Sequence, residues 1–468
     1  MNRRNVFLAL AFVWVGGSLL ADGWQRKSRD EIVRDVMAME RRVEAAQAAL
    51  KDRCRLTDYV SIVRTANGTN VWTDALRQAL KEHEVVVLPS REEPYCFDGQ
   101  VVVPSNRRIE AHGARTFLMA PCDVCLLRNE HVQDGYRRPV DGSVRDRNIA
   151  VVGGVWESWA DRRMAEGRGG RWTDGRERGG VGCKRFLGLS GHFYFGNVVG
   201  VTVKDIVFRS IGSFALQAGD AEDVVVRHLT FERCRADGFH CNGNVRNVHV
   251  EDLSGGCGDD LLALNFCDWP CSSVNFGPGD TILAEKIHAT SGCPWLRIFP
   301  AVHIYGDGTK VDCAARNLVI RDVRNVSEFK LYLQTRSYRI GGARDPMEVG
   351  SGGSIWFEDI QVGGVRAPWR IAANLTDVHF RSIDARKLRA GVPLVEVGGI
   401  SSYNAARKIE TFDPWVVCKV GTVEFADVDC PRSDSKVWAR CLVYPNPREN
   451  GDVGGHGEIG ETVVAPDL

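Results

Sequence analysis

The chain of 468 residues is 44% hydrophobic and 26% charged, a composition typical of folded globular proteins and different from that of disordered chains. Its 60 basic residues balance its 60 acidic residues, so no net charge favours nucleic acid or an anionic membrane surface as a partner. The 49 glycines fit many short strands joined by turns better than long helices.

The first residues have the order of a secretory signal peptide. Arg3-Arg4 precede an apolar run over residues 6–20, and the small residue Ala21 follows it. The alternative is an uncleaved anchor, because Leu19 is not the small residue expected three positions before the cut, but the run is short for a membrane span. We therefore expect a signal peptide over residues 1–21, a secreted or periplasmic protein, and no membrane span after cleavage.

The 15 cysteines suit an oxidising compartment, but their number is odd and the chain is too large to need a disulfide scaffold. Cys122 and Cys125, and likewise Cys267 and Cys271, are spaced like halves of zinc sites, yet neither pair has a second Cys/His pair at a recognisable spacing. We expect buried cysteines or local disulfides, and neither a metal site nor a cofactor.

Two helices are expected near the N-terminus. Residues 28–52 have helical spacing of apolar residues and predict one amphipathic helix, which looks like an appendage. Residues 73–83 predict a second helix, with Thr73-Asp74 as its cap. We assign residues 22–60 to an N-terminal helical segment, 61–430 to the main domain and 431–468 to a C-terminal tail.

Beyond these helices the apolar period changes to two, and one pattern of apolar-x-apolar-x-x-apolar recurs eight times. It begins at Val201, Val224, Val248, Ile282, Leu318, Ile355, Val378 and Val423. Steps of about 23 to 45 residues indicate a solenoid whose units bury a face by stacking, with loops inserted between the coils. The β-branched content favours strands, so we predict an all-β parallel β-helix; a helical solenoid and a β-sandwich are the alternatives.

Three carboxylates fall at matching places in this repeat. Asp237 follows Val224 by thirteen residues, and Asp260 follows Val248 by twelve, with Asp259 beside it. Stacked coils would bring them about 5 Å apart. Clustered carboxylates disfavour one another's ionisation, so the cluster indicates acid/base chemistry rather than stabilisation.

With further segments at 69–76, 84–89, 101–106 and 148–156, the sequence resembles pectin-lyase-fold proteins, which are right-handed parallel β-helices, over about residues 60–430. Within that fold it is similar to the polygalacturonase-type glycoside hydrolases of family 28. Arg235-Ala236-Asp237 stands where that family has Asn-Thr-Asp, and Gly258-Asp259-Asp260 matches its second motif. The resemblance implies that Asp259 is the general acid and that Asp237 and Asp260 activate water. It also implies inversion, for which carboxyl groups roughly 6.5–9.5 Å apart are expected.

The family's Gly-His-Gly and Arg-Ile-Lys motifs are missing at the expected places. Gly455-His456-Gly457 lies far away in the tail, and we interpret it as a coincidence. Arg297-Ile298 offers part of the other motif one coil early. Lys330 lies twelve residues after Leu318 and should point into the same groove, where it could hold a uronate carboxylate. His303, expected on a loop, could replace the missing histidine.

Other residues should surround the aspartates. By strand alternation, His240 should face away from Asp237 as a buried, hydrogen-bonded residue. Trp269 and Trp295, with Trp156 and Trp159, could stack against sugar rings. The arginine-rich residues 162–185 predict a loop that could attract an anionic polysaccharide.

These features predict a secreted glycoside hydrolase acting on a polysaccharide or oligosaccharide, of plant or algal type and bearing uronic acids. A polysaccharide lyase is the first alternative, with calcium bound by Asp237, Asp259 and Asp260. A β-helix that binds glycan without cleaving it is the second. No nucleic-acid partner is expected.

Overall fold

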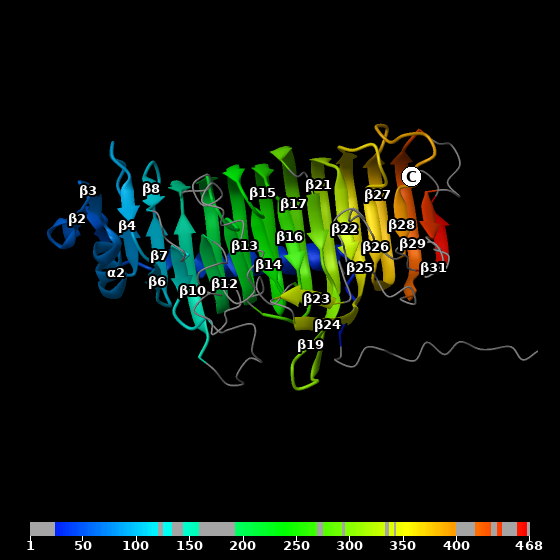
Figure 1. Ribbon diagram of the computed structural model, residues 1–468, viewed down its shortest axis with the longest axis horizontal. Helices are drawn as coiled ribbons and strands as arrows, with labels where there is room; N and C mark the ends of the chain where they lie inside the picture. Colours follow the sequence, from blue (N-terminus) through cyan, green and yellow to red (C-terminus); the bar gives the residue numbers. More distant parts are fainter. Residues whose placement is uncertain are drawn as a thin grey trace, which may run out of the picture.

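The computed structural model describes residues 24–119, 125–132, 144–158, 192–268, 275–292, 295–332, 337–340, 343–398, 417–431, 438–441 and 456–465. Strands in these ranges stack along one axis into a long parallel sheet that winds around a common core (Figure 1). The predicted right-handed parallel β-helix is thereby confirmed. The predicted signal peptide lies outside the described residues.

The described helices are α1 (Arg29–Ala48), the 3-10 helix η1 (Leu56–Ile62) and α2 (Thr73–Glu82). The strands at the N-terminal end are β1 (Arg53–Arg55), β2 (Arg64–Ala66), β3 (Thr69–Val71), β4 (Val85–Val87), β5 (Tyr95–Phe97), β6 (Val101–Val103), β7 (Arg107–Glu110), β8 (Arg115–Leu118), β9 (Leu127–Asn129), β10 (Asp146–Val152) and β11 (Val155–Glu157). The central strands are β12 (Phe193–Arg209), β13 (Leu216–Cys234), β14 (Phe239–Asn242), β15 (Val245–Cys257), β16 (Leu262–Asn265), β17 (Gly279–Gly292), β18 (Trp295–Ile298), β21 (Ala315–Val326) and β22 (Glu328–Tyr332). The helix continues with β25 (Ser351–Val362), β26 (Trp369–Ala372), β27 (Asn374–Asp384), β28 (Val395–Val397), β29 (Val417–Asp429), β30 (Ala439–Cys441) and β31 (His456–Val464).

A small antiparallel sheet stands apart from the coils. It consists of β19 (Ala301–Ile304), β20 (Lys310–Cys313), β23 (Ser337–Ile340) and β24 (Ala343–Val349). It forms from segments inserted between coils, as the long repeat steps predicted.

The eight predicted repeats occupy equivalent places in successive coils. Val201 pairs with Val224, and Val224 pairs with Val248. The remaining repeats follow in the same register, starting at Ile282, Leu318, Ile355, Val378 and Val423. These apolar side chains are buried in one continuous core, because each coil covers the inward face of the one before it.

The strands bend at a fixed place in each repeat. The residue before the third apolar position has φ between 51° and 59°, in the left-handed region. Five of these eight residues are Asp, which tolerates this conformation better than most. They are Asp205, His228, Asp252, Lys286, Asp322, Asp359, Ser382 and Asp427. The repeat therefore specifies the corner of each coil as well as its core.

The N-terminal helix is not the appendage that its sequence suggested. α1 crosses the outer face of the sheet, where its blue ribbon passes behind the central strands in Figure 1. The buried side chains of this contact are Ile32, Val36, Met39 and Val43 from the helix and Val225, Leu283 and Val319 from the sheet. The three sheet residues occupy the position between the first two apolar positions of their repeats, and this position faces outward from the coil. Because these outward positions are apolar, burying them requires a cover such as α1.

A charged network joins the middle of α1 to the sheet. Glu40 lies 2.8 Å from His249 Nδ1 and 2.5 Å from Arg227 Nη1. The other ring nitrogen of His249 lies 3.1 Å from Glu285. Burial disfavours the charged imidazole, but the hydrogen bonds to Glu285 and Glu40 outweigh it and raise the pKa of His249 to about 9. α1 is therefore held by charge as well as by apolar packing.

The other boundaries differ in detail from those predicted. α2 starts at Thr73, which is not its cap; the cap position is Trp72, and Thr73 Oγ1 donates to Asp98 Oδ1 instead. At the other end, β30 and β31 pair with β28 and β29, so the sheet continues into the segment assigned to a tail. Ile459 of this segment packs against the core, which is why the segment joins the β-helix.

Several cysteines of the described coils are buried thiols, the first of the two expected alternatives. Cys54, Cys234, Cys241 and Cys257 are buried thiols. Cys122 and Cys271, the partners of the two zinc-like half-motifs, lie outside the described residues. Over the part of the chain that the structure describes, no helix is long and apolar enough to cross a membrane.

Candidate active site

The three aspartates come together at the turns that precede β14 and β16. These two strands pair in register, with Phe239 opposite Leu262, so Asp237 and Asp260 occupy equivalent places on adjacent coils. The backbone N–H of Asp260 donates to Asp237 Oδ1 at 3.1 Å. With Asp259, the three residues bring carboxylate oxygens within 4.8 Å of one another. The stacking expected from the repeat is thus present in the structure.

Two glycines allow the turns to approach so closely. A Cβ atom on Gly238 would lie 2.6 Å from the carbonyl oxygen of Leu261, and one on Gly258 would lie 2.5 Å from that of Arg235. Neither distance is tolerated between a side chain and backbone, so a larger residue would push the coils apart. The glycine before Asp259 is therefore explained by packing.

Asp260 is fully buried and lies between two cations. Arg297 Nε is 2.9 Å from Asp260 Oδ2, and Lys330 Nζ is 3.3 Å from Oδ1. Arg297 and Lys330 are themselves buried, and they are register partners on β18 and β22. A buried carboxylate without such partners would carry a large desolvation penalty. The structure therefore brings together three of the predicted site residues in one ion-pair cluster.

Trp295 also lies in this cluster. It is half-buried at the start of β18, and Lys330 Nζ is 3.4 Å from the centroid of its ring. An ammonium over an indole face is attracted by the ring quadrupole. Trp295 therefore helps to hold Lys330, and sugar stacking by Trp295 stays a prediction.

Asp237 contacts a histidine, which the sequence analysis had placed on the opposite side. His240 Nδ1 lies 2.5 Å from Asp237 Oδ2, and both side chains are buried. The expected direction of His240 was wrong because Asp237 precedes β14 and lies outside the strand, where alternation does not apply. The expected burial and hydrogen bonding of His240 are confirmed. The other ring nitrogen lies 3.0 Å from Asp268, a site residue that the sequence analysis missed.

The same contacts set the ionisation of this group. Burial raises the pKa of Asp237 above its ordinary value, and the hydrogen bond with His240 opposes that rise. Burial disfavours the charged form of His240, but the hydrogen bonds to Asp237 and Asp268 prevail and raise its pKa to about 9. The cluster thus places an imidazolium between two carboxylates.

Asp259 has a different environment from its two neighbours. Its side chain is 46% exposed, and Arg297 Nη2 lies 3.7 Å from its Oδ1, farther than Arg297 Nε lies from Asp260. Partial burial, followed by the charges of Asp260 and Asp237, raises the pKa of Asp259 to about 7. Of the three aspartates, it is the one that combines solvent access with a proton to give near neutral pH.

The remaining predicted site residues lie elsewhere or cannot be placed. His303 is buried on β19, not on a loop, and its ring stacks on Phe276 with centroids 3.6 Å apart. Burial lowers its pKa to about 4, so it is a neutral packing residue. Trp156 is buried in the core and cannot stack on a sugar. Trp269, Trp159 and residues 162–185 lie outside the described residues.

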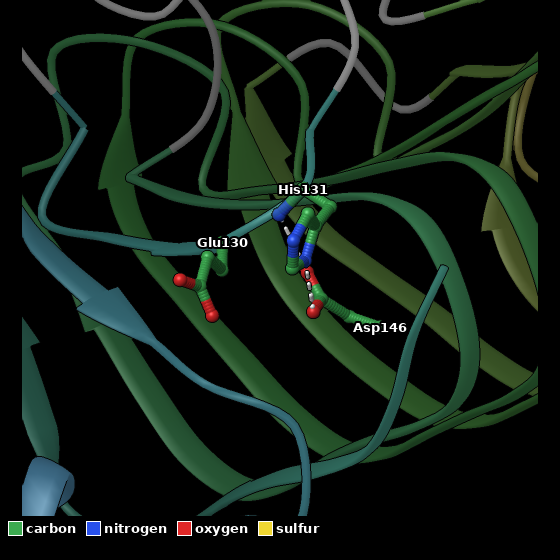
Figure 2. Close-up of side chains that lie close together, drawn as sticks. All are labelled: Glu130, His131 and Asp146. Atoms are coloured by element: carbon green, nitrogen blue, oxygen red, sulfur yellow. Dashed lines mark hydrogen bonds and ion pairs between the residues drawn. The ribbon is translucent and has the colours of Figure 1, made fainter. Parts of the chain in front are cut away.

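A second group of possible metal ligands consists of Glu130, His131 and Asp146 (Figure 2). Asp146 is buried, and its two oxygens accept hydrogen bonds from Ser105 Oγ, Asn129 Nδ2, His131 Nδ1 and the backbone N–H of His131. A carboxylate has about four acceptor positions, so these donors saturate it. Figure 2 draws hydrogen bonds between His131 and Asp146 and none from Glu130 to either of them. The group anchors the segment after β9 and does not fit a metal site.

The aspartate cluster does not fit calcium either. Calcium binds six to eight oxygen ligands, and its carboxylate ligands must not be paired with other cations. Here Asp260 is ion-paired to Arg297 and Lys330, and Asp237 is paired to His240. Cations that belong to the protein already balance the two buried carboxylates.

The spacing of the carboxylates differs from the expectation for an inverting enzyme. The nearest oxygens of the three aspartates lie within 4.8 Å of one another, which is closer than the expected separation of roughly 6.5–9.5 Å. Contact between adjacent coils imposes this closeness, because stacked strands are about 5 Å apart. The distance criterion for inversion is therefore not met.

No model of a known protein family matches this sequence, and no curated protein resembles it in sequence. Solved structures do resemble it in fold. An exopolygalacturonase from Thermotoga maritima has 12% sequence identity and a TM-score of 0.51, and the match covers 94% of this chain and 96% of that one. This likeness establishes a shared pectin-lyase-type β-helix and nothing finer.

Two weaker matches have different functions. The surface adhesin PfbA of Streptococcus pneumoniae has 11% identity and a TM-score of 0.45, with 88% of this chain and 97% of that chain covered. A family 28 exopolygalacturonase from Yersinia enterocolitica has 13% identity and a TM-score of 0.37, with 89% and 78% covered. Because a fold does not by itself determine function, function has to be argued from the site.

Proposed function

We propose that this protein is a glycoside hydrolase that cleaves a polysaccharide or oligosaccharide containing uronic acids. One observation carries the proposal: three adjacent aspartates lie in different environments. Asp237 and Asp260 are buried against cations, whereas Asp259 is half-exposed with a pKa of about 7. A carboxyl group that holds a proton near neutral pH, beside carboxylates paired with cations, can serve as the acid of an acid/base reaction.

In the proposed reaction, Asp259 donates its proton to the glycosidic oxygen as the bond between that oxygen and the anomeric carbon breaks. A water molecule attacks the anomeric carbon and gives a proton to Asp237, because Asp260 is fully enclosed between Arg297 and Lys330. The products are two shorter sugars, and a proton returned through solvent to Asp259 restores the site. No metal takes part in the proposed chemistry, because Arg297, Lys330 and His240 already supply the positive charge.

The uronate part of the proposal rests on Arg297 and Lys330. Arg297 extends from the buried Asp260 towards the half-exposed Asp259, so a sugar carboxylate beside Asp259 would meet its guanidinium. Guanidinium binds carboxylates strongly because its planar donors match their geometry. We also propose export of the protein, since such a polymer lies outside the cell.

The test is a reducing-sugar assay over pectic, rhamnogalacturonan and algal polysaccharides, with ultraviolet absorbance followed in parallel. Asp259→Asn should lower the rate by about 10² to 10⁴-fold, the usual contribution of a general acid. The matched control is Asp252→Asn, an exposed aspartate of β15 whose left-handed conformation asparagine also tolerates.

Three outcomes would count against the hydrolase. New absorbance from an unsaturated sugar would identify a lyase, and equal loss in both variants would remove the role of Asp259. Binding of a glycan without any cleavage would support the non-catalytic alternative.

A further inference from the structure

His240 is a buried histidine that contacts one aromatic ring and two carboxylates. It is 1% exposed, and its ring stacks on Phe214 with centroids 4.0 Å apart and planes 14° apart. Its two nitrogens face carboxylates on opposite sides, Asp237 at 2.5 Å and Asp268 at 3.0 Å. Stacking fixes the ring plane, and the two carboxylates fix its rotation.

A charged ring satisfies both contacts while both aspartates are ionised. A neutral imidazole carries one N–H and would turn a lone pair towards one of the two carboxylates, whereas an imidazolium donates to both. Asn242 Nδ2 also lies 3.1 Å from His240 Nε2 and donates to the carbonyl of Asn265, but this amide brings no charge to the ring. The charged groups that face His240 in the described coils are therefore Asp237 and Asp268.

Each buried aspartate of the proposed site thus has a cation of its own. Asp260 has Arg297 and Lys330, and Asp237 has His240. The charges around Asp237 are those of His240 on its own coil and, from the adjacent coils, Asp260, Asp259 and Arg297. Without the imidazolium, a buried carboxylate beside two others would hold a proton and could not take one from water.

We propose that His240, clamped between Asp268 and Asp237, is a positioning residue: a fixed cation that keeps Asp237 in the carboxylate form needed to accept a proton from water. Asp268 acts through His240 by holding the ring charged and oriented, at a distance from the reacting atoms. The inference rests on the proposed hydrolysis for its catalytic meaning, while the clamped cation itself is a property of the fold.

The test compares His240→Gln and Asp268→Asn with a matched control, His249→Gln. His249 is also buried between two carboxylates with a pKa of about 9, but it lies under α1. In the pH profile of kcat/KM, His240→Gln should move the acidic limb upward by about 1 to 3 pH units, the effect of losing an opposite charge. Asp268→Asn should move the limb in the same direction, and His249→Gln should leave it in place.

A second measurement does not depend on activity. NMR of histidine-labelled protein should show His240 charged at pH 7 in the wild type, and titrating at lower pH in Asp268→Asn. A neutral His240 at pH 7, or an acidic limb unmoved in active His240→Gln and Asp268→Asn proteins, would overturn the proposal. If no glycan is cleaved, the proposed function fails, and the NMR titration alone decides on the clamp. If His240→Gln does not fold, Asp268→Asn carries both measurements.

Discussion

Activity should fall as the pH rises through 7, because the proposed acid Asp259 has a pKa of about 7 and must be protonated to act. One unit below that value about 90% of the molecules carry the proton, and one unit above it about 10% do. We therefore expect kcat/KM for a polysaccharide to drop about tenfold between pH 6 and pH 8. An ordinary aspartate, with a pKa of about 4, would already be ionised throughout this range.

The assay measures initial rates across this range with two substrates, a natural glycan and an aryl glycoside with an acidic phenol as leaving group. A phenolate leaves without protonation, so the fall above pH 7 should disappear with the aryl glycoside, and that substrate should also restore activity to Asp259→Asn. A rate on the natural glycan that stays level or rises between pH 6 and pH 8 would refute the assignment of Asp259 as the acid.

Four further predictions concern the same framework. Asp259→Asn should raise Tm at pH 8 relative to wild type, because folding raises the pKa of this aspartate and its ionised form destabilises the native state; an unchanged Tm would contradict this. EDTA should leave the rate unchanged, and a loss restored by calcium would point to the lyase alternative. The ion pairs of His249 with Glu40 and Glu285 should stabilise the protein below the unfolded pKa of histidine, and this contribution should vanish as the pH rises through about 9. The Tm difference between wild type and His249→Gln should therefore be large at pH 6 and small at pH 10. Proton NMR of fresh products should show inversion despite the close spacing of the carboxylates, because Asp237 and Asp260 are engaged by cations and make poor nucleophiles; retention would contradict direct attack by water.

The core of the fold was predictable because inward-facing residues obey a strict pattern. A buried coil needs apolar side chains at fixed intervals, and Val224, Val248 and Ile282 fall in register as a result. The docking of α1 was missed, although the sequence held a signal for it. Val225 and Leu283 are apolar at positions that would be solvent-exposed in an uncovered coil, and an apolar stripe on the outer face implies a covering element.

The site was predictable in part for a related reason. Offsets from the repeat placed Asp237 beside Asp260 correctly, since nearly equal offsets on stacked coils imply contact. His240 and Asp268 were beyond that reasoning because their contacts depend on turns and ring rotation, which a two-residue period does not describe. The same limit explains why His303 was expected at the site but packs on Phe276.

Cleavage in heavy-oxygen water tests the central claim most directly. If the protein is a hydrolase that uses Asp259, wild-type protein should yield glycan fragments that carry one heavy oxygen at each new reducing end by mass spectrometry, and Asp259→Asn should yield almost none. Fragments that lack the heavy oxygen and contain a double bond would contradict hydrolysis, as would the absence of fragments from a glycan that the protein binds.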